Sequence, residues 1–585
     1  MEEQKSVFRI FKDEINDYFT KVVQVGENPS YSEAKLKRRI SLFANKIYPN
    51  GKFDSQGSYK FWFDIVQPRI DADVKNIDFD TKNIEVYTDR KQDVLPNIIV
   101  NLKNREYLRD TGQDEEINSA IEEGEGWGNV VWKKIKGGYE RVDLRNFYVI
   151  NQTAFNLDES PVIERHEMSQ SDLRKKSGIW KNIDDTIKGC KQNTYKATPE
   201  VQGNEMTMPH YPVYERNGEV SYFDLKQAKG ESPIEIDRDK FTLAKIITSG
   251  IETQGEHSFS PKYVLYAEEI KKMPYKEYHR GIYKGKWWRE GIYELLFDCQ
   301  VRANQIGNQI AQALEYASKL ILASEDKLIV QNILSDMKNG DIIVTKGLKQ
   351  VELRSQAIDQ LIADWNKNIQ IANDLANTRE IVQGEAQPGQ PFRLGALLNI
   401  NANKLFTFLR QKLAIPFREM FEEWIIPDLI NELKVKEIIR LTGDADVLER
   451  IYKIVVDDWY ISNLLAFGPH DEVMRELLKA QKLEELKNQE QLLMKALKEY
   501  WKEYKPNVNV IITGENINLD SDLQTLSSFA QLEADPVRRS AILELMARKK
   551  GLDFASLPKT PPIMPTVAPP QATQKPLALA GEQGT

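Results

Sequence analysis

The longest regular pattern in the sequence is an apolar stripe between residues 290 and 323. The stripe keeps the 3.6-residue period of an α-helix and comprises Ile292, Leu295, Leu296, Cys299, Ala303, Ile306, Ile310, Ala313, Leu314, Ala317, Leu320 and Ile321. At 1.5 Å per residue this helix would be roughly 50 Å long. Such a helix is unstable alone in water. The pattern therefore predicts that the stripe packs on a second long helix and on neighbouring subunits.

The segment after this stripe predicts a small β-structure and then a second long helix. Turn residues at 339–341 and 346–347 precede two short β-rich runs, 342–344 and 351–353. Short strands joined by a Lys-Gly turn are typical of a β-hairpin. A helical pattern resumes at 356 and continues to 382. The chain is therefore predicted to place a β-tip between two long helices.

A segment rich in glycine and proline follows the second long helix. Residues 384–395 contain four residues that break regular structure, which predicts a loop: Gly384, Pro388, Gly389 and Pro391. Residues 396–430 are predicted to be helical again. Pro416 removes a backbone donor from this helix and is expected to kink it.

The remaining segments predict an α+β fold that is mainly helical. Further helices are expected at 5–22, 32–47, 96–123, 471–504, 520–535 and 537–550. Residues 61–87 are expected to be helical up to or past Pro68 and then strand-like. A Gly137-Gly138 turn predicts a hairpin within 126–150, residues 195–265 a β-rich insert of short strands, and residues 508–513 a further strand. The proline-rich residues 558–585 are expected to be disordered.

Composition argues against a protein that wraps nucleic acid tightly. The 585 residues carry a formal net charge of −8, whereas tight binding of phosphates needs clustered Lys and Arg. Two cysteines, Cys190 and Cys299, offer no disulfide framework, which suits a reducing cytoplasm. The first residues lack the layout of a signal peptide, and no apolar run reaches membrane-spanning length. We therefore expect a protein made in a cytoplasm, without a membrane partner.

No motif in the sequence indicates an active site. There is no P-loop motif, and the five histidines lack metal-site spacing. Acidic pairs such as Asp71 and Asp73 could be imagined as ligands of a two-metal nuclease, but 88 carboxylates make such pairs common by chance. The cluster Gly124, Gly126 and Gly128 is interpreted as a turn rather than a phosphate loop. The prediction is a protein that is not an enzyme, with no catalytic residue, metal ligand or cofactor.

Two groups of residues suggest contact with a polyanion. Trp287 and Trp288 beside basic residues would suit base stacking, but a buried anchor for the long helix is the preferred interpretation. The predicted β-tip carries an excess of two positive charges; its basic residues are Lys327, Lys338, Lys346, Lys349 and Arg354, against Asp336, Asp341 and Glu352. Repeated around a closed ring of subunits, this excess would form a basic collar.

The order of these elements resembles that of the portal proteins of tailed bacteriophages, and is closest to portals of the short-tailed type. Residues 60–80 (KFWFDIVQPRIDADVKNIDFD) look like their N-terminal segment, and 285–309 (GKWWREGIYELLFDCQVRANQIGNQ) like the start of their first stem helix. Residues 384–397 (GEAQPGQPFRLGAL) resemble the tunnel-loop region, and residues 515–550 the crown helices. The resemblance lies in the order of elements more than in any invariant motif.

The resemblance implies a division of the chain into the parts of a portal subunit. These are a wing (1–284), a first stem helix (285–326), a clip (327–355), a second stem helix (356–383), a tunnel loop (384–396), a kinked helix with the rest of the wing (397–514), a crown (515–557) and the disordered tail (558–585). Expected roles are subunit packing in the stem for Ile292, Leu296, Ile306 and Ile310; DNA contact in the tunnel loop for Gln387, Gln390 and Arg393; a basic clip of Lys338, Lys346, Lys349 and Arg354; and a helix kink at Pro416.

The resemblance also implies a function in the virion. The family forms a ring, usually of twelve subunits, at one capsid vertex, and double-stranded DNA passes through it without sequence specificity. Its partners are the terminase large subunit during packaging, the major capsid protein and scaffold during assembly, and head-tail adaptor or tail proteins afterwards. Two alternatives remain open from the residues alone: a virion scaffolding or adaptor protein without a channel, and a metal-dependent nuclease.

Overall fold

The structure is a computed structural model. It describes residues 5–24, 43, 48, 51–53, 59–77, 84–87, 94–193, 209–253, 258–318, 322–324, 348–350, 356–376, 406, 408–442, 445–463, 472–488, 490–503, 507–510 and 527. All of these except Ser527 belong to one compact unit, Met1–Thr513. The expectation of a mixed α+β chain in which helices predominate is confirmed.

A six-stranded antiparallel sheet occupies the middle of the sequence. Its order is β4-β5-β7-β8-β9, with β6 paired to β7. The strands are β4 (Phe147–Val149), β5 (Val162–Met168), β6 (Gln192–Asn193), β7 (Pro209–Ser221), β8 (Phe241–Thr253) and β9 (Ser258–Glu269). The prediction of short strands in 195–265 is wrong, because three of these strands have 12 or 13 residues.

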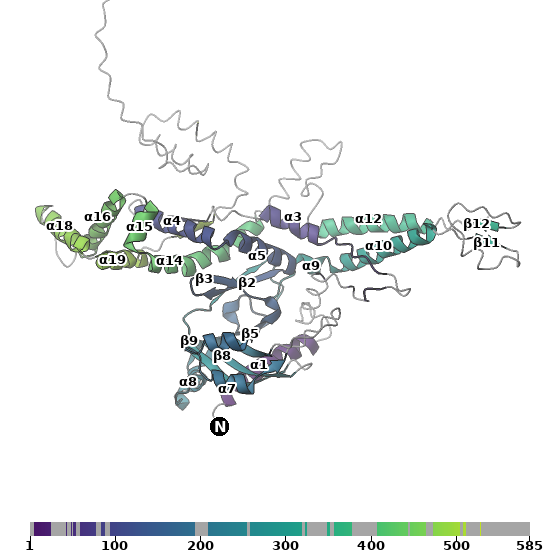
Figure 1. Cartoon of the computed structure of the whole chain (residues 1–585), viewed down its shortest axis with the longest axis horizontal. Coiled ribbons are helices and arrows are strands. Elements are labelled where there is room, and N and C mark those ends of the chain that lie inside the picture. The colour runs from purple at the N-terminus through teal and green to yellow at the C-terminus, as the bar shows by residue number, and fades with distance from the viewer. Residues whose placement is uncertain are drawn as a thin grey trace, which may run out of the picture. The chain divides into compact units, whose positions relative to one another are not determined.

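Helices cover both faces of this sheet, because successive strand residues point to opposite sides. Ile246 packs toward α1 (Lys5–Gln24) and α8 (Tyr222–Lys229). Its neighbour Ile247 packs toward α6 (Gln170–Lys175) and α7 (Ile183–Gly189). Figure 1 labels α1, α7 and α8 beside these strands.

A second sheet of three strands has the order β10-β2-β3. Its strands are β2 (Asn129–Ile135), β3 (Gly138–Arg141) and β10 (Tyr275–His279). Three short helices lie between strands of the chain: η3 (Leu144–Asn146) between β3 and β4, η4 (Leu157–Glu159) between β4 and β5, and η5 (Glu235–Asp239) before β8. The predicted hairpin is confirmed, because Ile135 pairs with Gly138 and Gly137 adopts a φ of +80°. Only glycine adopts such a φ readily.

A further group of helices encloses the largest of the described cores. They are α4 (Val94–Asp110), α5 (Gln113–Trp127), α14 (Ile426–Glu432), α15 (Val435–Thr442), α16 (Ala445–Ser462), α18 (Glu472–Asn488) and α19 (Glu490–Glu503), with β1 (Ile84–Tyr87) paired to β13 (Asn507–Val510). The single helices predicted over 96–123 and 471–504 are therefore each two helices. Gly112, with a φ of +63°, separates the first pair.

Two prolines bear on the expected helices. Helix α3 (Gln67–Ile77) runs past Pro68, which lies in its first turn, where proline is suited, whereas residues 61–66, also expected to be helical, are not. Helical structure continues through Pro416, and the irregularity is a π-helical turn, η6 (Phe421–Ile425). The cause lies in Pro427, which has no N–H for the carbonyl four residues before it, while the Ile426 N–H bonds the Phe421 carbonyl five residues back. Continuous helical structure is compatible with a bend, so the kink expected at Pro416 stays a prediction.

Candidate functional site: a two-helix hairpin and its supports

Two long helices pack against each other in antiparallel directions. They are α10 (Phe297–Ser318), preceded by the short α9 (Ile292–Leu295), and α12 (Gln356–Ala376). Arg302 pairs with Asp364 at 2.7 Å, and the Asn368 side chain donates to the Cys299 carbonyl at 2.9 Å. Figure 1 shows the two helices side by side. The predicted pairing of two long helices is thus observed, although α10 spans only about 33 Å.

An extended segment before α3 lies along α10 and is held there by amide side chains. The backbone N–H groups of Phe61, Phe63 and Ile65 donate to Asn308, Asn304 and Gln300 at 2.8, 2.8 and 3.0 Å. The side chains of Gln300 and Asn308 donate back to the Phe63 and Phe61 carbonyls at 2.6 and 3.0 Å. Four helical residues rise about 6.0 Å and two extended residues about 6.6 Å, so the two repeats stay in register.

These hydrogen bonds between amide side chains of α10 and the extended backbone form an amide ladder. Its three amide residues have a regular spacing in the sequence. Gln300, Asn304 and Asn308 recur every four residues and so share one face of α10. On the same helix, Gly307 leaves room for two aromatic rings: a Cβ there would lie 2.5 Å from Phe63 and 3.0 Å from Trp365. Helix α10 is therefore covered on two sides by its own chain.

The residues predicted to join subunits along the first helix are mostly used within the chain. Ile292, Leu296 and Ile306 have no exposed surface, and Ile310 is half-buried. Ile292 and Leu296 pack with residues of α3 and α12. A fully covered side chain has no area left for a second subunit, so the prediction is corrected for Ile292, Leu296 and Ile306 and stays a prediction for Ile310.

Other apolar side chains of the hairpin remain exposed in the single chain. They are Leu314 on α10 and Ile362, Ile371 and Leu375 on α12, each more than 40% exposed. Ile362 and Ile371 are nine residues apart, about two and a half turns, so they lie on opposite flanks of α12. Ile371 and Leu375 are one turn apart and share a flank.

A two-stranded pair lies between the two helices in the sequence. It joins β11 (Leu322–Ser324) to β12 (Leu348–Gln350). The first helix was therefore predicted too long at its end, because 322–324 is a strand. Lys349 lies on β12, but its side chain is not among those described. The other predicted residues of this region lie outside the described residues: Lys338, Lys346 and Arg354 of the clip, and Gln387, Gln390 and Arg393 of the tunnel loop. So do nearly all of the predicted helix at 32–47, the predicted strand at 342–344, the crown and the tail.

A buried ionic cluster ties the two sheets together. Glu164 of β5 and Glu215 of β7 are direct cross-strand partners, and like charges in that position repel. The ammonium group of Lys133, from β2, lies 2.7 Å from Glu164 and 2.8 Å from Glu215. A second cation, Lys245, lies 3.0 Å from Glu215. Burial would raise the pKa of Glu215, but the two lysines outweigh it and lower the pKa to about 2.

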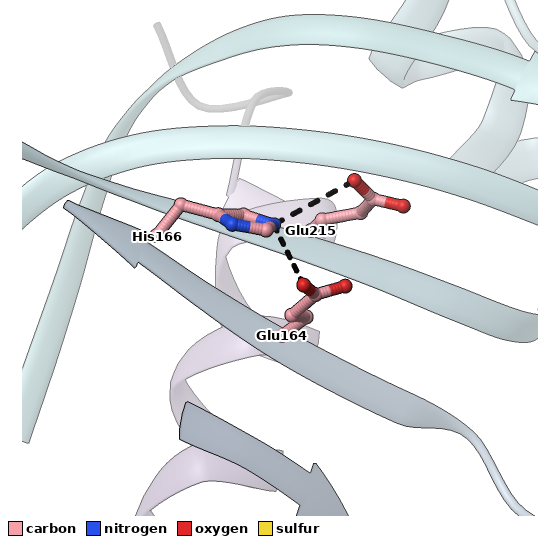
Figure 2. A group of neighbouring side chains, drawn as sticks. All are labelled: Glu164, His166 and Glu215. Carbon is pink, nitrogen blue, oxygen red and sulfur yellow. Dashed lines mark ion pairs between the residues drawn. The ribbon is translucent and has the colours of Figure 1, made fainter. Parts of the chain in front are cut away.

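Figure 2 shows the imidazole of His166 beside the same two carboxylates. His166 Nε2 lies 3.4 Å from Glu164 and 3.8 Å from Glu215. Together the three side chains have the composition of a metal site. However, Lys133 already binds an oxygen of each glutamate, and its positive charge would repel a metal ion at this position. We therefore interpret the cluster as structural. The spacing of Glu164 and His166, two residues apart, differs from helical metal-site spacing and places both side chains on one face of β5.

A second buried cluster contains one of the acidic residues considered for a nuclease. Arg280 lies 2.5 Å from Glu125 and 3.7 Å from Asp73, and Asp73 Oδ1 has no hydrogen-bond partner among the described residues. Burial and the Glu125 carboxylate raise the pKa of Asp73 to about 8, although Arg280 opposes them. Asp71, in contrast, is exposed and accepts from Gln67. The two aspartates do not converge on one site.

The raised pKa of Asp73 predicts a loss of stability as the pH rises. A carboxyl group whose pKa is higher in the folded state stabilises the fold fully below its unfolded pKa, about 4, and no longer does so above its folded pKa. We therefore expect the thermal midpoint to fall between about pH 4 and pH 8 and Asp73→Asn to flatten this fall. Asp71→Asn is the matched control and leaves the profile unchanged; equal profiles for wild type and Asp73→Asn would contradict the assignment.

The tryptophan pair and the glycine cluster are both part of the packing. Trp287 and Trp288 are buried beside the three-stranded sheet, and the Trp287 indole donates to Glu277. The preferred buried interpretation is confirmed. Gly124 and Gly126 lie within α5 rather than in a turn, and Gly128 caps it with a φ of +88°. Each glycine allows another segment to approach closely.

Comparison with known proteins does not assign a family. A scan of the chain against models of protein families finds no match, and a search of the curated proteins finds no significant relative. Within the residues that the structure describes, no helix is both long and apolar enough to cross a membrane.

Proposed function

We propose that this chain is the subunit of a bacteriophage portal, a ring at one capsid vertex through which double-stranded DNA enters and leaves. The observation that carries the proposal is the helical hairpin α10–α12, which ends in a small β-pair and keeps apolar side chains exposed on two opposite flanks of α12.

The exposed flanks favour a closed ring over a two-fold dimer. A ring needs a heterologous contact, in which each subunit offers one surface to one neighbour and a different surface to the other. Ile362 supplies an apolar position on one flank of α12, and Ile371 with Leu375 supplies the other. Burying such side chains is favourable by about 25 cal/mol per Å² of apolar surface. A twelve-fold ring, an acidic channel wall with basic collars, and docking of terminase and head-tail proteins are part of this proposal.

The first test is the oligomeric state of the purified full-length chain. We expect negative-stain images to show rings with a central hole, and light scattering to give one mass of about twelve subunits. Monomers or open filaments at micromolar concentration would exclude the portal. Helical oligomers without a channel would favour the alternative, a scaffolding or adaptor protein.

A charge on one flank of α12 is expected to block ring formation. In the variant Ile371→Asp with Leu375→Asp, each new carboxylate would have to be desolvated in the contact, which costs several kcal/mol per charge. Because both side chains are exposed, the subunit itself should remain folded. The expected result is a monomer with an unchanged circular-dichroism spectrum.

The matched control places two charges on the side of α12 that faces away from α10. Asn366→Asp with Gln370→Glu changes exposed residues between the two flanks and should leave the rings intact. Rings from the Ile371/Leu375 variant, or loss of rings in the control, would remove the support that the flanks give to the proposal.

A further inference from the structure

A large groove lies between the three-stranded sheet and the helical core. It is lined by the end of β2, the segment 271–274 before β10, the π-helical turn with α14, the start of α15, and α19. Its volume is about 1520 Å³. This exceeds the range of roughly 300–1,000 Å³ that is typical of small-ligand pockets, so the groove has the size for a polymer segment rather than a metabolite.

The groove is strongly basic in an acidic chain. Seven lysines and three glutamates line it, although the whole chain has a net charge of −8. Two of the lysines are engaged, Lys272 with Glu423 at 2.9 Å and Lys498 with the Asn431 carbonyl at 2.7 Å. The other five are exposed and have no ion-pair partner among the residues described: Lys134, Lys271, Lys434, Lys436 and Lys495.

The wall between these lysines is apolar. Pro427 is exposed, and Pro274 and Met494 are partly exposed in it. The indole N–H of Trp501, a side chain that is 98% buried in the same wall, has no hydrogen-bond partner among the described residues. The π-helical turn also contributes to the wall, and such turns are frequent at functional sites. The groove therefore combines free positive charge with apolar surface.

We propose that this groove binds an acidic, amphipathic segment of a partner protein. The lysines would attract its carboxylates, and the apolar wall would take the apolar residues of one helical face, as in other helix-in-groove complexes. This inference does not depend on the portal assignment.

Nucleic acid fits the groove less well. Single strands bind by stacking bases on exposed aromatic faces, but Trp424 and Trp501 in the wall are only 4% and 2% exposed. The lining contains lysine and no arginine, so it lacks the planar fork that binds phosphate in a bidentate manner. Lysine attracts carboxylates as well as phosphates, and the apolar wall then favours a peptide.

The test is fluorescence anisotropy with the full-length chain. The probe is a labelled peptide of about eighteen residues, with leucine at i, i+3, i+4 and i+7 and glutamate elsewhere. Competitors are a scrambled peptide of the same composition and a single-stranded oligonucleotide. We expect saturable binding at physiological salt, weaker binding of the scrambled peptide and no displacement by the oligonucleotide.

Charge reversal then locates the site. Lys434→Glu, Lys436→Glu and Lys495→Glu together should weaken peptide binding about tenfold or more. The control triple Lys176→Glu, Lys188→Glu and Lys191→Glu changes the same charge at exposed lysines outside the groove and should change binding less than about twofold. No saturable binding, equal loss in both triples, equal affinity of the scrambled peptide, or displacement by the oligonucleotide would each overturn the proposal.

Discussion

Replacing Lys133 by alanine should destabilise the two sheets by about 3–5 kcal/mol, the range for breaking a buried ion pair by removing one partner. The ammonium group is the shared partner of Glu164 and Glu215, and all three side chains are less than 10% exposed. Without it, two carboxylates face each other across β5 and β7, and among the described residues Lys245 is the remaining lysine that pairs with either of them. Hydrogen exchange at peptides from these strands would measure the loss.

The effect of Lys133→Ala should depend on pH in a defined direction. In the wild type, the low pKa of Glu215 contributes stability above pH 4.5 that is lost as the pH falls toward 2. In the variant, the burial of Glu215 is opposed by fewer cations, so protonation of Glu215 would stabilise the fold. We therefore expect the difference between variant and wild type to be largest near neutral pH and to shrink toward about pH 5.

Lys134→Ala is the matched control for Lys133→Ala. Lys134 is the next residue of β2 and is exposed, so its replacement should change stability by less than about 0.5 kcal/mol. A second comparison adds Glu164→Gln and Glu215→Gln to Lys133→Ala, which removes the uncompensated charges and should recover part of the loss. If Lys133→Ala and Lys134→Ala cost the same, the cluster does not hold the sheets together.

Of the described glycines near the helical hairpin, Gly291 should tolerate an added methyl group least, so Gly291→Ala should strongly destabilise the fold. A Cβ at this position would lie 2.2 Å from the Gly126 carbonyl oxygen and 2.4 Å from the Gly128 nitrogen. Both contacts are with backbone, which cannot rotate away as a side chain can. The backbone of Gly291 is extended, with a φ of −98°, so the clash rather than its conformation causes the effect.

We expect Gly291→Ala to cost at least about 3 kcal/mol, the upper part of the range for overpacking a core. Because Gly291 immediately precedes α9, the loss should appear as faster hydrogen exchange in α9 and the first turns of α10. Gly178→Ala is the control, since nothing lies within 4 Å of a Cβ there, and it should be neutral or slightly stabilising. Unchanged exchange in the Gly291 variant would show that the end of α5 and the start of α9 can separate at little cost.

Part of the candidate site follows from local pattern alone. The periodic stripe from Ile292 onward and the pattern over 356–382 predicted two helices that need each other, and α10 and α12 do pack together. A helical stripe marks which side of a helix must be covered, and this depends only on residues within one or two turns. The Gly137-Gly138 hairpin was likewise predicted from residues that are close together in the sequence.

The sequence did not show what covers each surface. The stripe gave no sign that Ile292 and Leu296 would be enclosed by α3, α12 and the segment 59–66, while Ile371 and Leu375 stay exposed. The amide ladder joins residues more than 230 positions apart. A periodic pattern indicates an apolar or polar face of a helix but does not indicate which segment covers that face.

Thus the sequence by itself determined the mixed fold class, the helical hairpin and the buried tryptophan pair, because local periodicity and turn residues decide them. Only the tertiary structure decided the Lys133 cluster, the close contacts of the glycines and the basic groove. Each of these joins side chains from distant segments, and their meeting depends on strand register and helix packing that no single segment encodes.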